Sequence, residues 1–214
     1  MTKNLKGLLG AAAVAVALSA GTAHAQFISG GITVTDGLSG LPSGASTSIV
    51  SALTAITHTG PGAPQGCTGT FAATGTCTAP PTFNASMTDW SFGGPYGFTI
   101  IMANGFSFTL LSAGAVTPTP MVCGTGSCND ALTVSNLVGI VSGNGFNPTA
   151  FTGSLALTGA CESQDGTTCS GGQTGGFTYS LTALGRSTVP EPGTLALLGL
   201  GLAGLAVVRR RKQS

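Results

Sequence analysis

Few side chains between Gln26 and Thr188 are suited to acid–base chemistry. This segment has one histidine, one arginine and no lysine, and its acids are Asp36, Asp89, Asp130, Glu162 and Asp165. A Ser–His–Asp hydrolase would have to use His58, but no G-x-S-x-G motif accompanies it. A carboxylate pair for glycoside hydrolysis is available as Glu162 and Asp165, in a loop without aromatic residues. We therefore expect no catalytic residues and no enzyme activity.

Metal and cofactor sites have equally weak signals. Asn129 and Asp130 with the Glu162 and Asp165 pair offer oxygen ligands for Ca²⁺, but the D-x-D-x-D-G spacing of a calcium loop is absent. Zinc would be expected at a C-x-x-C pair, and covalent haem at C-x-x-C-H, and the chain has neither motif. We expect no metal and no cofactor.

The N-terminus has the layout of a secretory signal peptide. Its parts are two cations, an apolar run and a small-x-small cleavage site: Lys3 and Lys6, Leu8 to Ala20, and Ala23 with Ala25. Cleavage by signal peptidase would leave Gln26 as the first mature residue. We expect residues 1–25 to direct export through the Sec machinery; the alternative is an uncleaved anchor helix.

An exported chain with an even number of cysteines is expected to form disulfides. Six cysteines allow fifteen pairings. Proximity in the sequence favours three local pairs, Cys67–Cys77, Cys123–Cys128 and Cys161–Cys169. Each would close one loop and contribute about 2–3 kcal/mol where it is unstrained. We expect all six cysteines to lie in loops.

The segment 26–188 is predicted to fold as one all-β domain. Short runs of alternating apolar residues are separated by turns rich in glycine and proline, and no run predicts a convincing helix. The clearest hairpin is Gly97–Leu111, centred on Asn104-Gly105, with Phe106, Phe108 and Leu110 on one face. We expect about eight or nine strands in a single antiparallel β-sandwich, jelly-roll-like.

Three further segments carry individual expectations. Residues 47–59 combine helical spacing with many β-branched side chains, and we favour a strand. The segment with Pro118 and Pro120 is predicted as a loop. Residues 131–142 are predicted as a strand that bends near Asn136 or Gly139.

The charge of the domain excludes nucleic acid as a partner. One cation and five acids give the segment 26–188 a formal charge of 1 − 5 = −4. A protein without basic patches cannot neutralise a phosphate backbone. Its solubility must come from Ser, Thr, Asn, Gln and Gly, a composition typical of secreted proteins associated with polymers.

The C-terminal residues 189–214 combine three physically distinct parts. They are a rigid Pro-flanked glutamate, an uncharged apolar run and a cluster of four cations: Val189, Pro190, Glu191 and Pro192, then Thr194 to Val208, then Arg209, Arg210, Arg211 and Lys212. As a helix, the apolar run would reach about 22 Å, against a bilayer core of about 30 Å. We expect a marginal transmembrane helix whose cations stay cytoplasmic, with the domain on the periplasmic side of the inner membrane.

This three-part order resembles the PEP-CTERM sorting signal of Gram-negative bacteria that produce exopolysaccharide. The resemblance covers about the last 25 residues. It implies that a membrane-embedded exosortase recognises Pro190, Glu191 and Pro192 and cuts near them, and that the protein passes to the cell surface or extracellular matrix.

We therefore expect a non-enzymatic surface or matrix protein, associated with exopolysaccharide or biofilm. One alternative is a carbohydrate-binding module or adhesin that exposes Trp90, Tyr96 and Tyr179 as an aromatic platform. The other is a secreted hydrolase that uses Glu162 and Asp165.

Overall fold

The computed structural model describes residues 26–43, 46–77 and 85–185. Four predicted features lie outside these residues: the signal peptide with Ala23 and Ala25, the motif Val189 to Pro192, the apolar run 194–208 and the cations 209–212. Within the described ranges, no helix has the length and apolar character needed to cross a membrane.

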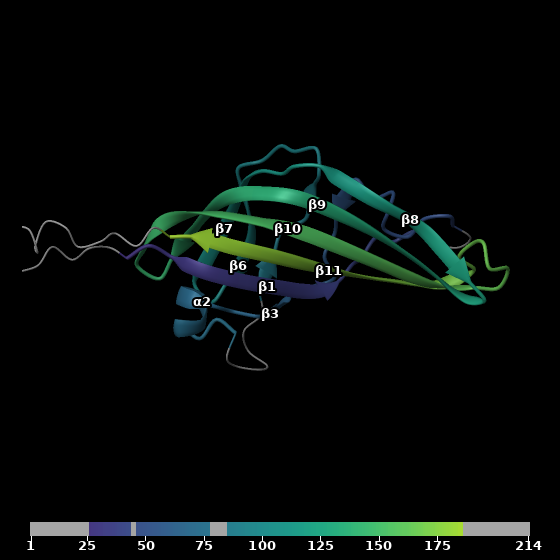
Figure 1. The fold of residues 1–214 in the computed structure, drawn as a ribbon, viewed down its shortest axis with the longest axis horizontal. Helices are drawn as coiled ribbons and strands as arrows, with labels where there is room; N and C mark the ends of the chain where they lie inside the picture. The colour runs from purple at the N-terminus through teal and green to yellow at the C-terminus, as the bar shows by residue number, and fades with distance from the viewer. Residues whose placement is uncertain (1–25, 44–45, 78–84, 186–214) are drawn as a thin grey trace, which may run out of the picture. The chain divides into compact units, whose positions relative to one another are not determined.

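Antiparallel strands make up most of the described chain (Figure 1). The bounds of the strands are β1 (Ser29–Gly37), β2 (Ala55–Ile56), β3 (Ala63–Gln65), β4 (Ser86–Met87), β5 (Trp90–Ser91), β6 (Phe98–Ala103), β7 (Phe106–Ser112), β8 (Val116–Gly124), β9 (Gly126–Gly143), β10 (Phe146–Ser163) and β11 (Gly171–Leu184). Nine of them form one sheet in the order β3-β1-β11-β10-β9-β7-β6-β4, with β8 also paired to β9. Strands β2 and β5 form a separate ladder.

One face of the large sheet forms the core. Side chains alternate between buried and exposed along β9, β10 and β11, the three longest strands. In β11, for example, Phe177, Tyr179, Leu181 and Ala183 are buried, and the residues between them are at least partly exposed. This alternation is the sequence pattern that predicted the strands.

Irregular segments and a short helix complete the core. Helix α2 (Gly69–Ala73) places the buried Phe71 against Phe106 and Phe108 of β7, with ring centroids 5.0 and 5.6 Å apart. The buried Trp90 of β5 donates its indole N–H to the hydroxyl of Tyr179 in β11, at 2.7 Å. Trp90 therefore belongs to the core.

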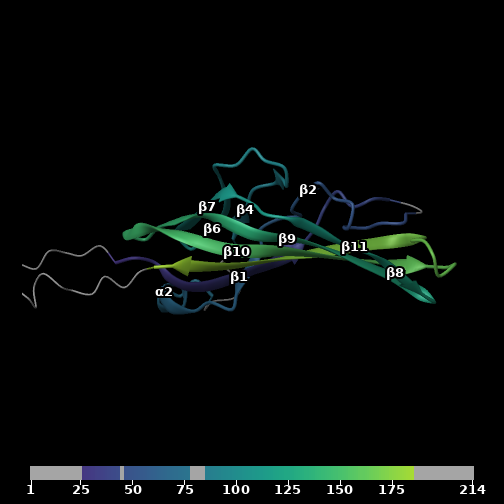
Figure 2. The same cartoon turned by 45° about the horizontal axis from the view of Figure 1, so that its top comes forward.

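The all-β class is confirmed, and the sandwich is not. The described residues form one curled sheet and a two-residue ladder, without a second large sheet facing the first (Figures 1 and 2). Proline and glycine interrupt the segments 59–66 and 93–97, and β3 within the first and β5 just before the second have only three and two residues. Strand β3 pairs with β1 at the edge of the large sheet, so these segments add no second sheet among the described residues.

The predicted hairpin and bend are confirmed. Asn104 and Gly105 both have positive φ, 45° and 78°, as a two-residue turn between β6 and β7 requires. Asn136 has φ 50°, and the register between β9 and β10 shifts beside it. Two residues of β9 oppose one of β10 there, so Val134 and Leu137 both face the core.

Other expectations are wrong. Residues 47–59 contain a turn and only the short β2, because the N–H groups of residues 49–51 bond to the Asp130 carboxylate instead of a ladder. Helix α2 was not expected. Pro118 and Pro120 lie in β8, an edge strand, where a residue without an N–H is tolerated.

Candidate functional site

The three local disulfides are confirmed. Cys67–Cys77, Cys123–Cys128 and Cys161–Cys169 are bonded, with Cα–Cα distances of 5.7, 4.0 and 5.7 Å. The expectation that all six cysteines lie in loops is wrong, because Cys123, Cys128 and Cys161 belong to β8, β9 and β10. Cys123–Cys128 therefore links two strands of the sheet, β8 and β9.

Two of these disulfides lie next to each other. Cys128 is directly opposite Cys123 on one side and Cys161 on the other, so three strands contribute a row of cysteines. The Sγ atoms of Cys128, Cys161 and Cys169 all lie within 4.8 Å of one another. Three thiolates at such a distance would suit a soft metal ion, but each of these sulfurs is already in a disulfide.

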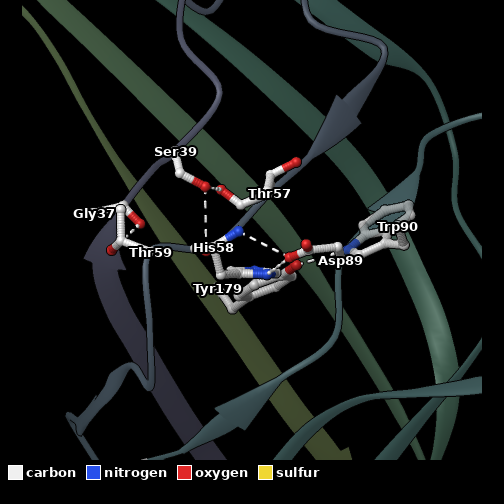
Figure 3. Close-up of polar contacts among 8 residues, drawn as sticks. All are labelled: Gly37, Ser39, Thr57, His58, Thr59, Asp89, Trp90 and Tyr179. Carbon is white, nitrogen blue, oxygen red and sulfur yellow. Dashed lines mark hydrogen bonds and ion pairs between the residues drawn. The ribbon is translucent and has the colours of Figure 1, made fainter.

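Among the described residues, one ion-pair contact joins a base to an acid, and it lies between His58 and Asp89 (Figure 3). The Asp89 Oδ1 accepts from the backbone N–H of His58 at 2.8 Å and lies 2.9 Å from its Nδ1. The His58 side chain is 3% exposed and its ring lies edge-on to Phe177, with centroids 4.9 Å apart. Asp89 is 56% exposed. The contact therefore joins the loop after β2 to the loop before β5.

The two pKa values indicate which atom carries the proton. Burial lowers the pKa of His58, against the hydrogen bond and charge of Asp89 and the charge of Asp36. The backbone N–H of His58 is the main cause that lowers the pKa of Asp89. At neutral pH, a neutral imidazole thus donates from Nδ1 to a carboxylate.

The remaining imidazole nitrogen is not arranged for catalysis. In a Ser–His–Asp triad, the second nitrogen accepts the proton of a nucleophile. Here the Nε2 atom of His58 is buried and has no hydrogen-bond partner among the described residues. A cleft of about 500 Å³ lies beside the pair and is lined by His58, Thr59, Gly60, Pro61, Ser86, Met87, Thr88 and Asp89. The pair therefore acts as a structural link at the wall of this cleft.

We expect this buried histidine to make folding sensitive to mild acid. The unfolded chain takes up a proton near pH 6.5, whereas folded His58 resists protonation until a lower pH. The unfolded state thus binds more protons, and the free energy of unfolding falls as the pH drops below about 6.5. Urea unfolding between pH 5 and 7.5 measures this slope, the change in the free energy of unfolding with pH. Asp89 and Asp130, whose pKa values are lowered in the folded protein, add their own loss only as the pH approaches 3.8.

The variant His58→Asn provides the control for that slope. Asparagine keeps an N–H donor near Asp89 and does not titrate. Since His58 is the only histidine between residues 26 and 188, the variant should lose most of the slope between pH 5 and 7. An unchanged slope would show that another group causes it.

Two of the three rings of the alternative aromatic platform, Trp90 and Tyr179, are buried. Trp90 and Tyr179 are 5% and 0% exposed and are hydrogen-bonded to each other. Tyr96 is half-buried and donates its hydroxyl to the Phe92 carbonyl. These rings do not form a face open to solvent, because the core needs them for packing.

The candidate carboxylates have structural partners. Asp165 accepts the N–H groups of Thr167 and Thr168, both at 2.8 Å, and these bonds hold its pKa far below the ordinary value. Buried Asp130 accepts three backbone N–H groups, so its oxygens are not free for Ca²⁺. Glu162, at the end of β10, packs beside Gly172. This arrangement gives no support to an acid pair for glycoside hydrolysis.

Comparison with known proteins identifies one segment with a recognised function, at the C-terminal end of the sequence. A model of the PEP-CTERM protein-sorting motif matches residues 188–212. The chain carries a PEP-CTERM sorting motif. No curated protein and no solved structure matches the chain significantly.

The PEP-CTERM match covers the motif, the apolar run and the cations that the sequence singled out. Such a motif marks a protein for export, for processing by an exosortase and for sorting to the cell envelope or surface. The individual roles of Pro190, Glu191 and Pro192 stay predictions, as does a helix over residues 194–208. The contact between His58 and Asp89 was not foreseen, since 31 residues separate the two side chains.

Proposed function

We propose that the mature protein is a non-enzymatic component of the cell surface or extracellular matrix. In this proposal an exosortase recognises Pro190-Glu191-Pro192, removes the tail and releases the β domain to associate with exopolysaccharide or biofilm. The observation that carries the proposal is the sorting motif at residues 188–212. The inner membrane holds the protein only before this cleavage, because the apolar run is short for a permanent span.

The exposed face of the sheet supports a polymer-associated role. Hydroxyl side chains form rows across its strands. One row runs from β8 to β1 with Thr117, Thr133, Thr178 and Thr35, and is interrupted on β10 by Ala156. A second row contains Ser154, Ser180 and Thr33. Uncharged hydroxyls can exchange hydrogen bonds with water for hydrogen bonds with a neutral polymer, without burying a charge.

The sorting step is tested by the mass and location of the mature protein. The host is compared with a strain that lacks its exosortase, and both are compared with a variant whose Pro190, Glu191 and Pro192 are replaced by alanine. We expect a shortened C-terminus and surface location only for the natural chain in the complete host. An identical C-terminal mass in all three cases would refute exosortase processing.

The matrix role needs a separate readout. A deletion strain is complemented with the natural chain or with the alanine variant of the motif, and adherent biomass and retained polysaccharide are measured. We expect only the natural chain to restore both. Purified protein is also incubated with a polysaccharide panel; hydrolysis that disappears in Glu162→Gln with Asp165→Asn would overturn the non-enzymatic assignment.

A further inference from the structure

The sulfur atoms of the disulfides Cys123–Cys128 and Cys161–Cys169 lie close together. Cys128 lies opposite both Cys123 of β8 and Cys161 of β10, and it is bonded to the first. Its Sγ lies within 4.8 Å of both sulfurs of the second disulfide, Cys161–Cys169. Cys128 thus has alternative partners on either side of its own strand.

Burial restricts which of these sulfurs an outside molecule can attack. Cys128, Cys161 and Cys169 are at most 5% exposed. Cys123 is half-buried on the edge strand β8, and its neighbour Val122 is 71% exposed. Thiol–disulfide exchange requires access of a thiolate to one sulfur of the bond. A thiol from solution therefore has Cys123 as its accessible target.

We propose that the two disulfides form a relay that captures a small thiol at Cys123. In the first step, an external thiolate attacks the Cys123 Sγ, a mixed disulfide forms, and Cys128 leaves as a thiolate. In the second step, the Cys128 thiolate attacks the Cys161 Sγ, so that a Cys128–Cys161 bond forms and Cys169 leaves as a thiolate and takes up a proton. Each step breaks one S–S bond and forms one, so no oxidant or reductant beyond the incoming thiol is needed.

The fold favours the second step. A thiolate at Cys128 would be buried, where charge is poorly solvated, and both sulfurs of the second disulfide lie within 4.8 Å of it. Directly opposite residues of antiparallel strands have Cα atoms about 4.5–5.5 Å apart, which suits a disulfide between Cys128 and Cys161.

The product keeps the displaced thiol inside the domain. In the structure, where Cys169 is bonded to Cys161, its side chain is 0% exposed and its Sγ lies 3.7 Å from the Met121 sulfur. A thiol at Cys169 is therefore shielded from thiols in solution, as Cys128 is. The relay converts the hairpin β8–β9 into a site for covalent attachment of thiol compounds, independently of the proposed matrix role.

The variant Cys123→Ser tests the second step without an external thiol, because it leaves Cys128 unpaired. The full chain is exported, blocked with N-ethylmaleimide and digested with chymotrypsin and a glutamyl endopeptidase, which separates Cys161 from Cys169 after Glu162. Trypsin is unsuitable, since no lysine or arginine lies between residues 26 and 185. We expect a Cys128–Cys161 disulfide and a blocked Cys169. An intact Cys161–Cys169 disulfide with a blocked Cys128 would overturn the relay.

Cys67→Ser is the matched control, because it also frees one cysteine, Cys77, but outside the sulfur group. We expect Cys77 to stay unpaired and both other disulfides to stay intact. Equal rearrangement in this variant would mean general scrambling and would also overturn the relay.

Natural protein treated with glutathione gives a readout that needs no substitution. One glutathione at Cys123 with a free Cys169 is expected, whereas a free Cys128, or no reaction at Cys123, contradicts the proposal.

Discussion

Replacing Asp130 with asparagine is expected to lower the free energy of unfolding by about 3 kcal/mol or more. The Asp130 side chain is buried and accepts the backbone N–H groups of Ile49, Val50 and Ser51 at 2.8, 3.0 and 2.9 Å. Burial alone would raise the pKa of Asp130, but these donors, led by Ser51, outweigh it and hold the pKa below its ordinary value. Asparagine would turn an NH₂ group toward some of these donors and leave them unpaired.

The neighbouring strand shows how closely this turn is packed. Gly159 of β10 lies directly opposite Asp130, and a Cβ at Gly159 would lie 2.5 Å from Oδ1 of Asp130 and 2.7 Å from Cβ of Ile49. No room exists for a water molecule to replace the carboxylate. The unpaired N–H groups would therefore be buried without an acceptor, and each would destabilise the folded state by its full desolvation free energy.

Urea unfolding at pH 7 measures the effect, and Asp165→Asn is the matched control. Asp165 also accepts two backbone N–H groups, but it lies in an exposed loop where water can take over. We expect a much smaller loss for this variant. Equal losses for the two substitutions would show that burial of Asp130 is not the cause. Because its folded pKa is lowered, Asp130 should stabilise the protein above about pH 3.8 and lose this effect as the pH falls further.

Features set by neighbouring residues were predictable from the sequence. The Asn104-Gly105 turn, the bend at Asn136 and the three local disulfides each depend on backbone preferences or on separations of 10 residues or fewer. The alternation in Gly176–Leu184 likewise predicted which side chains of β11 are buried.

Features that depend on distant partners were not predictable in this way. The turn at residues 49–51 is stabilised by Asp130, about 80 residues later, so its own β-branched residues indicated a strand instead. Strand β1 pairs with β11, which brings Ile32 opposite Leu181 and places the first and last strands side by side. Periodicity identifies the buried face of each strand but not the neighbour of each strand. It therefore could not distinguish one curled sheet from a sandwich.

Gly139 is a single residue whose role could not be predicted from the sequence, because it depends on distant partners. The sequence predicts a bend near Asn136 or Gly139. The positive φ and the register shift between β9 and β10 lie at Asn136, whereas Gly139 pairs with Phe151 of β10 and with Leu110 of β7, whose register with β9 shifts just after Leu110. A Cβ at Gly139 would overlap the Thr109 carbonyl oxygen and lie 2.6 Å from the Phe151 ring. That ring packs in turn on Phe108, with centroids 5.6 Å apart. The glycine is needed because an aromatic ring covers its backbone.

We therefore expect Gly139→Ala to lower the free energy of unfolding by about 2 kcal/mol or more. Within a strand, alanine ordinarily stabilises the folded state relative to glycine by about 0.5–1 kcal/mol. The expected loss of stability therefore has the opposite sign to this intrinsic preference for alanine. Gly124→Ala is the control, since it also changes a strand residue and a Cβ there would have no atom within 4 Å. Urea unfolding should show a neutral or slightly stabilising effect for Gly124→Ala. Similar stabilities for the two variants would mean that Phe151 moves aside at little cost.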